Sequence, residues 1–103
     1  MDISIVIVAF KSDHILENLI SKIPNHYEII VVENSLQYKT KTYLESKFQN
    51  TKVLIPNENL GYSAGVNLGI EKSSKDFIFI VTADVNFSSD MLQKLEGCIK
   101  KFH

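Results

Sequence analysis

Hydrophobic residues gather in four short runs that are rich in β-branched and aromatic side chains. The first, Ile3–Phe10, and the second, Tyr27–Val32, contain almost no polar residue. Such runs are typical of strands that are buried on both faces of a sheet. Two further runs, at Lys52–Ile55 and Asp76–Val81, predict a brief third strand and a fourth one.

Between these runs, apolar residues recur at the three- and four-residue spacing of amphipathic helices. A first helix is predicted after Ser12 and Asp13, which can cap it, and Pro24 ends it. Its apolar stripe consists of Ile15, Leu16, Leu19, Ile20 and Ile23. A weaker pattern over residues 37–48 predicts a second helix, with buried positions at Tyr43, Leu44 and Phe48.

Two more helices complete the pattern. The segment Gly61–Ser73 predicts a helix that buries Val66 and Ile70. A last helix can be capped by Ser88, Ser89 and Asp90, and its stripe is Met91, Leu92, Leu95, Ile99 and Phe102. Strand and helix thus alternate four times along the chain. This alternation predicts an α/β fold, in which a parallel sheet lies between two layers of helices and the crossovers are right-handed.

In an open sheet of this kind, ligands bind beyond the carboxyl ends of the strands, where the strand order reverses. The rule selects four corners of the chain, which are Ala9–Lys11, Glu33–Ser35, Asn57–Gly61 and Thr82–Asn86. These are also the most polar or glycine-marked corners. We therefore expect the functional site at this edge of the sheet.

Composition narrows the range of ligands for such a site. The 103 residues, 45% of them hydrophobic, are enough for one small domain. The formal net charge is −1, and all eleven basic residues are lysines. Arginine, the usual reader of guanine edges and bidentate clamp of phosphates, does not occur. Nucleic-acid binding is therefore not expected, and an anion site must use backbone N–H groups, helix ends and a metal ion.

Cysteine usage and hydropathy bear on the compartment. Cys98 is the single cysteine, which excludes an internal disulfide and fits a reducing environment. The first apolar run is short for a signal peptide, and Asp2 precedes it where a basic residue is usual. No segment approaches the ~20 apolar residues that span a bilayer. We expect a cytoplasmic domain, with any membrane association made through other parts of a longer protein.

Asp84 is the strongest candidate for a metal ligand. It follows the fourth predicted strand, where a carboxylate can bind Mg²⁺ or Mn²⁺ together with the phosphates of a substrate. Alternatively, Asp84 only caps the next helix. The metal role is favoured because Ser88, Ser89 and Asp90 are already suited to that cap.

A second candidate feature consists of Asn59, Gly61, Gly65, Asn67 and Gly69. Glycines four residues apart share one helix face, so the backbone can approach a neighbouring strand or a ligand. The amino end of a helix also offers free N–H groups and partial positive charge to a phosphate. Close packing of the helix on the sheet, without any ligand, explains the same spacing. The spacing alone leaves both interpretations open.

The end of the second predicted strand, Glu33-Asn34-Ser35, is the third candidate. A carboxylate there can accept the imide N–H of a uracil or thymine ring, or a ribose hydroxyl. Alternatively, Asn34 and Ser35 form a turn that caps the next helix, and Glu33 is solvated. Phe10, at the end of the first strand, could either stack on a base or belong to the core.

Taken together, these corners resemble the amino-terminal, nucleotide-binding half of family 2 glycosyltransferases, which have the GT-A fold. Residues 5–11 are similar to the family's first strand, which usually ends in Thr-Tyr-Asn. Glu28–Ser35 matches the second strand, which ends in an acidic residue that reads the base. Asn59–Ile70 is close to the form found in rhamnosyltransferase-like members. The resemblance extends from Ile3 to about Leu95.

The resemblance implies a role for each corner in binding a UDP-, dTDP- or GDP-sugar. Ala9 and Phe10 would line the base, and Glu33 or Asn34 would bond its polar edge. The segment Asn59–Asn67, which includes Gly61 and Gly65, would flank the ribose and the diphosphate. Asp84 would be the metal ligand of the family's Asp-x-Asp signature. The implied strand order, 3-2-1-4, would place Asp84 beside Phe10.

Three departures from the family pattern change the expected contacts. Thr82 stands at the first acidic position of Asp-x-Asp, so a hydroxyl replaces or weakens the ribose or metal contact made there. Lys11 stands where Asn is usual, and Glu33 replaces a shorter Asp. The family's acceptor-binding half, with its general base, has no counterpart among these residues.

The reaction that the resemblance implies is inverting transfer of a sugar to an acceptor hydroxyl, in polysaccharide or other cell-surface glycan synthesis. A metal would stabilise the departing diphosphate, and a carboxylate would take the proton of the hydroxyl. Since no residue here is a candidate for that base, we expect a donor-binding half with little transferase activity alone. Apolar surface left open on such a half favours self-association.

Other function classes fit less well. A non-catalytic nucleotide-binding or interaction module is favoured by Thr82 and by the missing half. A receiver-like signalling domain would need an acidic cluster near the first strand and an Asp after the third, where Ile55-Pro56 stands. A nucleotidyltransferase would need a glycine-rich loop directly after the first strand. Only the non-catalytic module therefore stays beside the glycosyltransferase.

Overall fold

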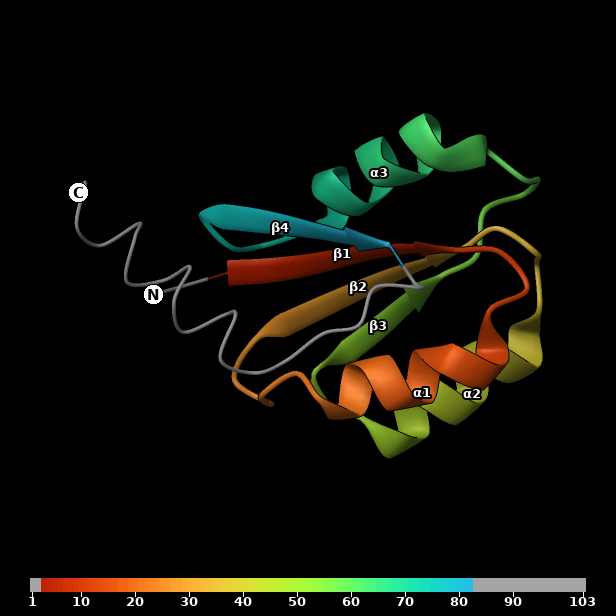
Figure 1. The fold of residues 1–103 in the computed structure, drawn as a ribbon. Helices are drawn as coiled ribbons and strands as arrows, with labels where there is room; N and C mark the ends of the chain where they lie inside the picture. Colours follow the sequence, from red (N-terminus) through yellow and green to blue (C-terminus); the bar gives the residue numbers. More distant parts are fainter. Residues whose placement is uncertain (1–2, 83–103) are drawn as a thin grey trace.

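The structure, a computed structural model, describes residues 3–82 of the chain (Figure 1). Strands and helices alternate along this range, as the hydrophobic pattern predicts. They are β1 (Ile3–Ala9), α1 (Asp13–Ser21), β2 (Glu28–Glu33), α2 (Tyr38–Lys47), β3 (Thr51–Leu54), α3 (Gly61–Lys72) and β4 (Phe77–Thr82). Asp84 and the predicted last helix lie outside the described residues.

The four strands form one parallel sheet in the order β3-β2-β1-β4. The predicted order 3-2-1-4 and the three-layer α/β class are therefore confirmed. α1 and α2 lie on one face of the sheet and α3 lies on the other (Figure 1). The chain runs outward from β1 to β3 and then returns to place β4 on the far side of β1. The strand order thus reverses between β1 and β4, where the ligand rule places a site.

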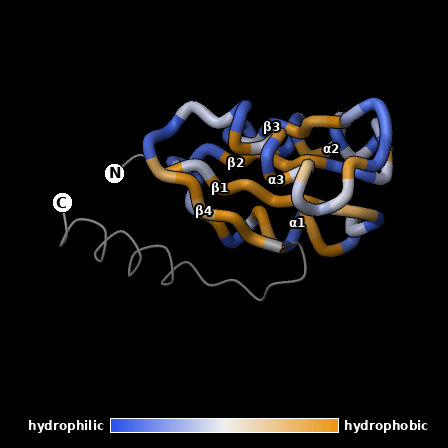
Figure 2. Tube along the Cα trace, turned by 90° about the horizontal axis from the view of Figure 1, so that it is seen from above, coloured by the Kyte–Doolittle hydropathy of each residue, from blue (hydrophilic) through white to orange (hydrophobic). Residues whose placement is uncertain are grey.

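The main hydrophobic core lies between the sheet and the layer of α1 and α2. Alternate residues of β1 serve the two faces, so that Ile5 and Ile7 enter this core while Val6 and Val8 lie under α3. Figure 2 shows hydrophobic residues along the central strands and hydrophilic ones mainly in the connections. The core consists of Ile3, Ile5, Ile7, Ala9, Leu16, Leu19, Ile20, Ile23, Tyr27, Ile29, Val31, Leu44, Val53 and Val81.

α3 packs on the sheet through glycines rather than through large side chains. A Cβ added at Gly69 would lie 2.4 Å from Cγ1 of Val6, and one added at Gly65 would lie 3.0 Å from Cγ1 of Val8. Both glycines are buried, whereas Val66 is half-buried and Ile70 is 38% exposed. The prediction that this helix buries Val66 and Ile70 is therefore wrong. α3 is turned so that its glycines, and not its branched residues, face the strands, and this allows the close approach.

α2 also differs from its predicted pattern. Leu44 is buried and Phe48 packs against the core, but Tyr43 is 50% exposed, so the prediction that Tyr43 is buried is wrong. Its hydroxyl donates to Oε1 of Glu17 on α1 at 2.9 Å, and Lys47 bonds the same carboxylate. A tyrosine can stay at the surface in this way because its tip is polar.

Candidate functional site

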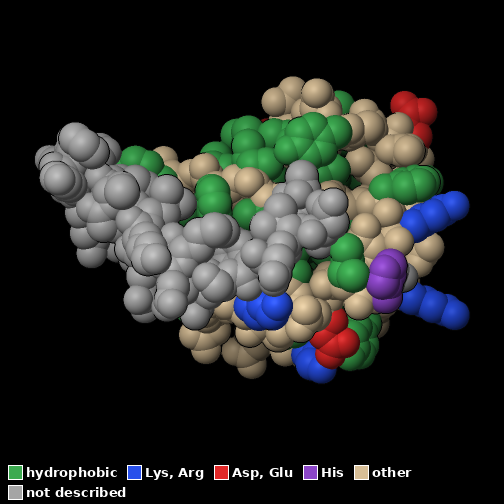
Figure 3. Space-filling view, viewed as in Figure 1, with side chains coloured by type: hydrophobic (Ala, Val, Ile, Leu, Met, Phe, Trp, Pro, Cys, Tyr) green, Lys and Arg blue, Asp and Glu red, His purple; other side chains and the backbone are tan. Residues whose placement is uncertain are grey.

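The carboxyl ends of the strands meet at one edge of the sheet. We call this edge the rim and define it by residues 9–11, 33–37, 57–61 and 82. Ala9 at the end of β1 lies beside Glu33 of β2, and Thr82 at the end of β4 lies beside Val8. The predicted corners therefore converge as far as they are described. In the space-filling view, Lys, His and acidic side chains all project from this end of the molecule (Figure 3), so it carries charges of both signs.

Glu33 is fully buried, with 0% exposure, although its side chain is polar and ionisable. Oε1 accepts the N–H of Ser35 at 3.0 Å and also the Ser35 hydroxyl, and Oε2 accepts the N–H of Gln37 at 2.7 Å. A buried carboxylate needs such donors, because an unpaired charge away from water is strongly unfavourable. The alternative in which Glu33 is solvated is therefore wrong. The carboxylate lies just before α2, where the partial positive charge of the helix end also favours it.

Ser35 joins the tips of β1 and β2. Its Oγ, which donates to Glu33, accepts the N–H of Lys11 at 3.2 Å. Beside this contact, the N–H of Asn34 donates to the carbonyl of Ala9 at 2.8 Å. Lys11 has φ 52° and Leu36 has φ 62°. A non-glycine residue in this left-handed region costs roughly 1–2 kcal/mol, so both tips depend on their surroundings to hold them.

Asn34 attaches the end of β2 to the start of α3. It is only 3% exposed, and its side-chain amide is used in both directions. Nδ2 donates to the carbonyl of Gly61 at 3.1 Å, and Oδ1 accepts the N–H of Leu60 at 3.2 Å. The amide therefore fixes the loop that leads into α3.

The start of α3 is accessible. Oδ1 of Asn59 accepts the N–H of Gly61 at 2.9 Å, and Gly61 has φ 77° with no atom within 4 Å of an added Cβ. Residues 61–64 are exposed, the first turn carries no acidic residue, and Asn67 is exposed one turn further on. Gly65 and Gly69 face the sheet instead. Of the two interpretations of the glycine spacing, close packing accounts for Gly65 and Gly69, while Gly61 and Asn67 remain open to a ligand.

Phe10 and Ala9 have opposite environments. Ala9 is 1% exposed and belongs to the core, whereas Phe10, one residue past the end of β1, is 51% exposed. The alternative in which Phe10 belongs to the core is therefore wrong. Nζ of Lys11 lies 5.3 Å from the centroid of the Phe10 ring. Ser12 stands at the N-cap of α1, but its hydroxyl donates to the carbonyl of Phe10 at 3.0 Å instead of capping the helix.

The predicted metal site is only partly within the described range. β4 brings the chain to the rim at Thr82, but Asp84 lies beyond it. Within residues 3–82, no three His, Cys, Asp or Glu side chains come together as a metal site. Mg²⁺ is usually held by one or two carboxylates plus substrate phosphates, so a site of this kind needs only a single protein carboxylate. The assignment of Asp84 stays a prediction.

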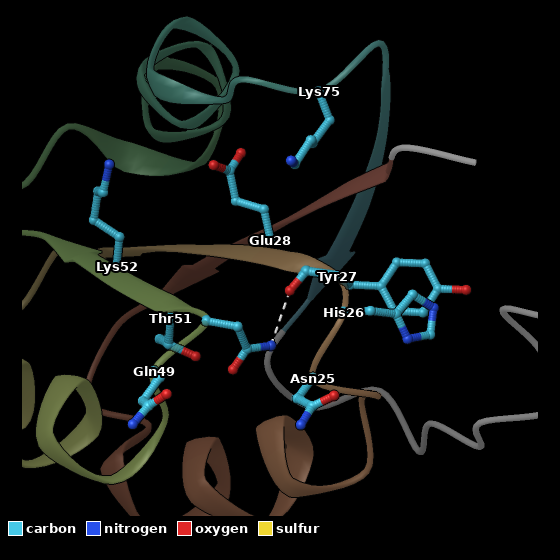
Figure 4. Close-up of a pocket in the computed structure, with 9 residues that line it drawn as sticks. Asn25, His26, Tyr27, Glu28, Gln49, Thr51, Lys52 and Lys75 are labelled. Carbon is cyan, nitrogen blue, oxygen red and sulfur yellow. Dashed lines mark hydrogen bonds between the residues drawn. The ribbon is translucent and has the colours of Figure 1, made fainter.

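Two surface hollows lie away from the β1 and β2 tips. One, of about 590 Å³, lies beside β3 between Leu54 and Leu68 and reaches the rim at Asn57, Glu58 and Leu60. Another, of about 310 Å³, lies at the opposite end of the sheet, where β2 and β3 begin (Figure 4). There the Asn50 amide donates to the carbonyl of Tyr27 at 2.9 Å.

Glu28, in the second hollow, is tied into the fold. It accepts the hydroxyl of Ser4 at 2.6 Å, and the N–H and hydroxyl of Ser74 at 2.9 and 2.7 Å. Burial raises the pKa of Glu28, but these hydrogen bonds outweigh burial and hold the pKa below its usual value of 4.5. This end of the sheet is therefore held together by its polar groups.

The sequence placed Ser35 and Lys11 at two of the corners but did not predict the contact between them, and it gave Leu36 no role. The only signal was the spacing of Glu33 and Ser35, since a polar side chain often bonds the backbone two residues further on. Nothing in the sequence reveals that the same serine also reaches Lys11 on another strand.

Comparison with known proteins identifies the family. The sequence model for the family described as "Glycosyl transferase family 2" matches residues 4–101, almost the whole chain. The chain belongs to glycosyl transferase family 2. The resemblance drawn from the strand tips and from Asn59–Ile70 is thereby confirmed.

Curated relatives resemble the chain in sequence, and solved structures resemble it in fold. The low-salt glycan biosynthesis hexosyltransferase Agl10 of Haloferax volcanii is 28% identical over 98 residues, which are 91% of this chain and 31% of Agl10. Residues 1–349 of S. aureus TarS, solved with UDP-GlcNAc, superpose with a TM-score of 0.80 at 20% identity and cover 98% of this chain and 32% of that one. Mannosyltransferase PcManGT from Pyrobaculum calidifontis, solved with GDP-Man and Mn²⁺, gives 0.75 at 14% identity, with 87% and 30% covered.

This glycosyl transferase family 2 chain is much shorter than those proteins. It spans about a third of the length of the curated relatives that it matches. At 14–20% identity, the structural likeness shows the fold alone. Within residues 3–82, no helix combines the length and the apolar character that crossing a bilayer requires.

Proposed function

We propose that the chain is the donor-binding half of a hexosyltransferase, which binds a nucleoside-diphosphate sugar and a divalent cation at the rim. The observation that carries this proposal is the convergence of sequence-selected corners at one edge of the sheet, in a member of glycosyl transferase family 2. Support comes from proteins of the same fold that were solved with UDP-GlcNAc or with GDP-Man and Mn²⁺.

In this proposal the base lies at the tips of β1 and β2. The exposed ring of Phe10 offers it a stacking surface, and the backbone of the β2 tip lies beside this ring, with Ala9 and the side chains of Glu33 and Asn34 buried behind. The ribose and diphosphate extend past Asn59 to the first turn of α3. Free N–H groups at a helix start, with no acidic residue beside them, favour a phosphate there.

The cation, Mg²⁺ or Mn²⁺, would be held by Asp84 and by the diphosphate, with Thr82 close by on β4. Its chemistry is to stabilise the charge that develops on the departing diphosphate. The chain's own residues would bind and orient the donor so that an acceptor hydroxyl displaces the nucleotide with inversion. A carboxylate must take the proton of that hydroxyl, and we propose that it comes from outside residues 1–103.

The biological setting follows from the same assignment. We propose that the transfer serves polysaccharide or other cell-surface glycan synthesis, and the glycan-related name of the Haloferax relative supports this. A cytoplasmic location fits the single cysteine of the chain.

Calorimetric titration tests the donor site. UDP, dTDP and GDP are titrated with and without Mn²⁺ into the native chain, the Asp84→Ala variant and the Asp76→Ala variant. Asp76 is a matched control because it is exposed and precedes the opposite end of β4. We expect metal-dependent binding in the native chain and in Asp76→Ala, and its loss in Asp84→Ala. Equal binding in all three proteins would show that Asp84 is not the metal ligand. If the native chain binds no nucleotide, the proposed donor site is wrong.

A non-catalytic nucleotide-binding module is the second candidate, because Thr82 stands where the family signature has an acidic residue. It predicts that Mn²⁺ leaves nucleotide affinity unchanged in the native chain. Under the donor-binding proposal, Thr82→Asp should instead strengthen the metal dependence, since it adds a second carboxylate next to Asp84.

A further inference from the structure

Glu33 is the least accessible charged group of the rim. Its side chain has no exposed surface, and three donors from Ser35 and Gln37 already bond its two oxygens. A base N–H could reach this carboxylate only if the turn over residues 34–37 opened first. Breaking hydrogen bonds to a buried polar group costs free energy. Direct binding of a base to Glu33 would have to offset this cost.

The same bonds give Glu33 an indirect route to the β1 tip. A serine hydroxyl has a single proton, and Ser35 donates it to Glu33. The lone pairs of Oγ are then directed to other donors, and the N–H of Lys11 occupies one of them at 3.2 Å. The Oε1 acceptor of Glu33 therefore sets the orientation of the hydroxyl that holds Lys11.

Both strained residues of the rim depend on this network. The carboxylate bonds the N–H groups of Ser35 and Gln37, which lie on either side of Leu36 with its φ of 62°. Lys11, with φ 52°, is held through Ser35. Phe10 directly precedes Lys11, so the backbone that carries its exposed ring is held by the same contacts.

We propose that Glu33 is a positioning residue of the donor site. It does not touch the base; it fixes the β1 tip, Phe10–Lys11, and the β2 tip in the conformation that receives the nucleotide. This inference rests on the proposed function, which places the base at these two tips. It assigns recognition of the base to Phe10 and to the backbone of the tips.

UDP and CDP separate positioning from direct recognition. The two bases have almost the same shape, but N3 carries a hydrogen-bond donor in uracil and is an acceptor in cytosine. If Glu33 accepts the imide N–H, then Glu33→Gln, whose amide can donate, shifts the preference from UDP toward CDP. If Glu33 only positions the tips, Glu33→Gln lowers the affinity for UDP and for CDP by the same factor, about tenfold. The reason is that the network loses one carboxyl acceptor.

Ser35→Ala provides a second variant, which removes the bond to Lys11 and the hydroxyl donor to Glu33 while the Glu33 side chain stays in the sequence. We expect it to lower the affinity for UDP and CDP equally, and the double variant to lose less than the product of the two single losses, since both residues act in one network. Glu71→Gln is the matched control, because Glu71 is exposed on α3 away from the rim. It should leave both affinities unchanged. Ser35→Ala also decides the question if Glu33→Gln does not fold.

The ligand-free protein gives an independent readout. In ¹H–¹⁵N spectra, we expect the amide resonance of Lys11 to move in both Glu33→Gln and Ser35→Ala, and to stay in place in Glu71→Gln. A shift of preference toward CDP by tenfold or more, or the first appearance of CDP binding in Glu33→Gln, overturns the proposal. So does a Lys11 resonance that stays in place in both rim variants. If the native chain binds no nucleotide, the donor site fails, while the Lys11 resonance still decides whether Glu33 positions the tip.

Discussion

Gly69 determines how closely α3 lies on the sheet. In the interior of a helix, replacing Gly by Ala ordinarily stabilises by up to about 1 kcal/mol. Here the new Cβ would lie 2.4 Å from Cγ1 of Val6, a residue with no exposed surface and a stiff side chain. We expect Gly69→Ala to reduce the free energy of unfolding by about 1–3 kcal/mol, as measured by urea denaturation.

Two substitutions in the same helix serve as controls. Ser63→Ala, at an exposed position, should be neutral or slightly stabilising. Gly61→Ala meets no atom within 4 Å but must keep φ 77°, so it should cost about 1 kcal/mol through the backbone alone. A Gly69→Ala protein as stable as Ser63→Ala would contradict the close packing of α3.

Glu28 makes stability depend on pH at the other end of the sheet. Its hydrogen bonds hold the pKa below 4.5 in the folded chain. A carboxyl with a depressed folded pKa contributes stability above its unfolded pKa, and this contribution is lost as pH falls through the folded value. Glu28→Gln should therefore lower the urea midpoint at pH 7, and its gap to the native chain should shrink as the pH falls through the depressed pKa, below 4.5. The same change at exposed Glu71 is the control, and a gap between Glu28→Gln and native that does not shrink in acid would contradict the role of the charge.

At the scale of elements, β3 is the outer strand of the described sheet, and α2 covers its free edge. The N–H of Val53 donates to Oε2 of Glu45 at 2.8 Å, and Nζ of Lys41 donates to the carbonyl of Val53 at 2.8 Å. Lys41 and Glu45 also pair with each other at 2.9 Å. Together they bond the same backbone groups that another strand would, and so protect the edge from pairing with a second chain.

Removing this cover should expose the edge. In the double variant Lys41→Ala/Glu45→Ala, we expect faster hydrogen exchange at the Val53 amide, because its acceptor is gone, and concentration-dependent association in sedimentation velocity. The double variant Glu17→Ala/Lys47→Ala is the matched control, since it removes an ion pair between α1 and α2 that touches no strand edge. Equal association in both double variants would mean that loss of charge, and not the open edge, is the cause.

The sequence predicted the elements well where local pattern decides them. The β-branched runs of β1 and β2 and the stripe of α1 are strong signals, and the strand order followed from the family resemblance. The buried face of α3 was predicted wrongly because it depends on how closely the helix approaches Val6 and Val8, which is a tertiary contact. At the rim, residue types indicated the location. The burial of Glu33 and the link from Ser35 to Lys11 join separate strands, and no local pattern contains them.

At the scale of the whole molecule, the rim joins chain segments that are far apart in sequence, from Ala9 to Thr82. A nucleotide that contacts several of these tips binds only the folded chain. Ligand at 100 times its dissociation constant should therefore stabilise the fold by about 2.7 kcal/mol. For a domain of this size, each kcal/mol corresponds to roughly 4–8 °C in the midpoint of thermal unfolding. We expect UDP with Mn²⁺ to raise the midpoint of the native chain accordingly.

Phe10→Ala tests whether that stabilisation comes from the rim. Phe10 is 51% exposed, so its loss should change the ligand-free midpoint little, whereas the base loses its stacking partner and the midpoint rise falls. Tyr43→Ala is the matched control, because Tyr43 is a 50% exposed aromatic on α2, bonded to Glu17 rather than placed at the rim. It should keep the full rise with UDP and Mn²⁺. An equal rise in the two variants would mean that the nucleotide does not contact Phe10. The nucleotide would then bind somewhere other than the tip of β1.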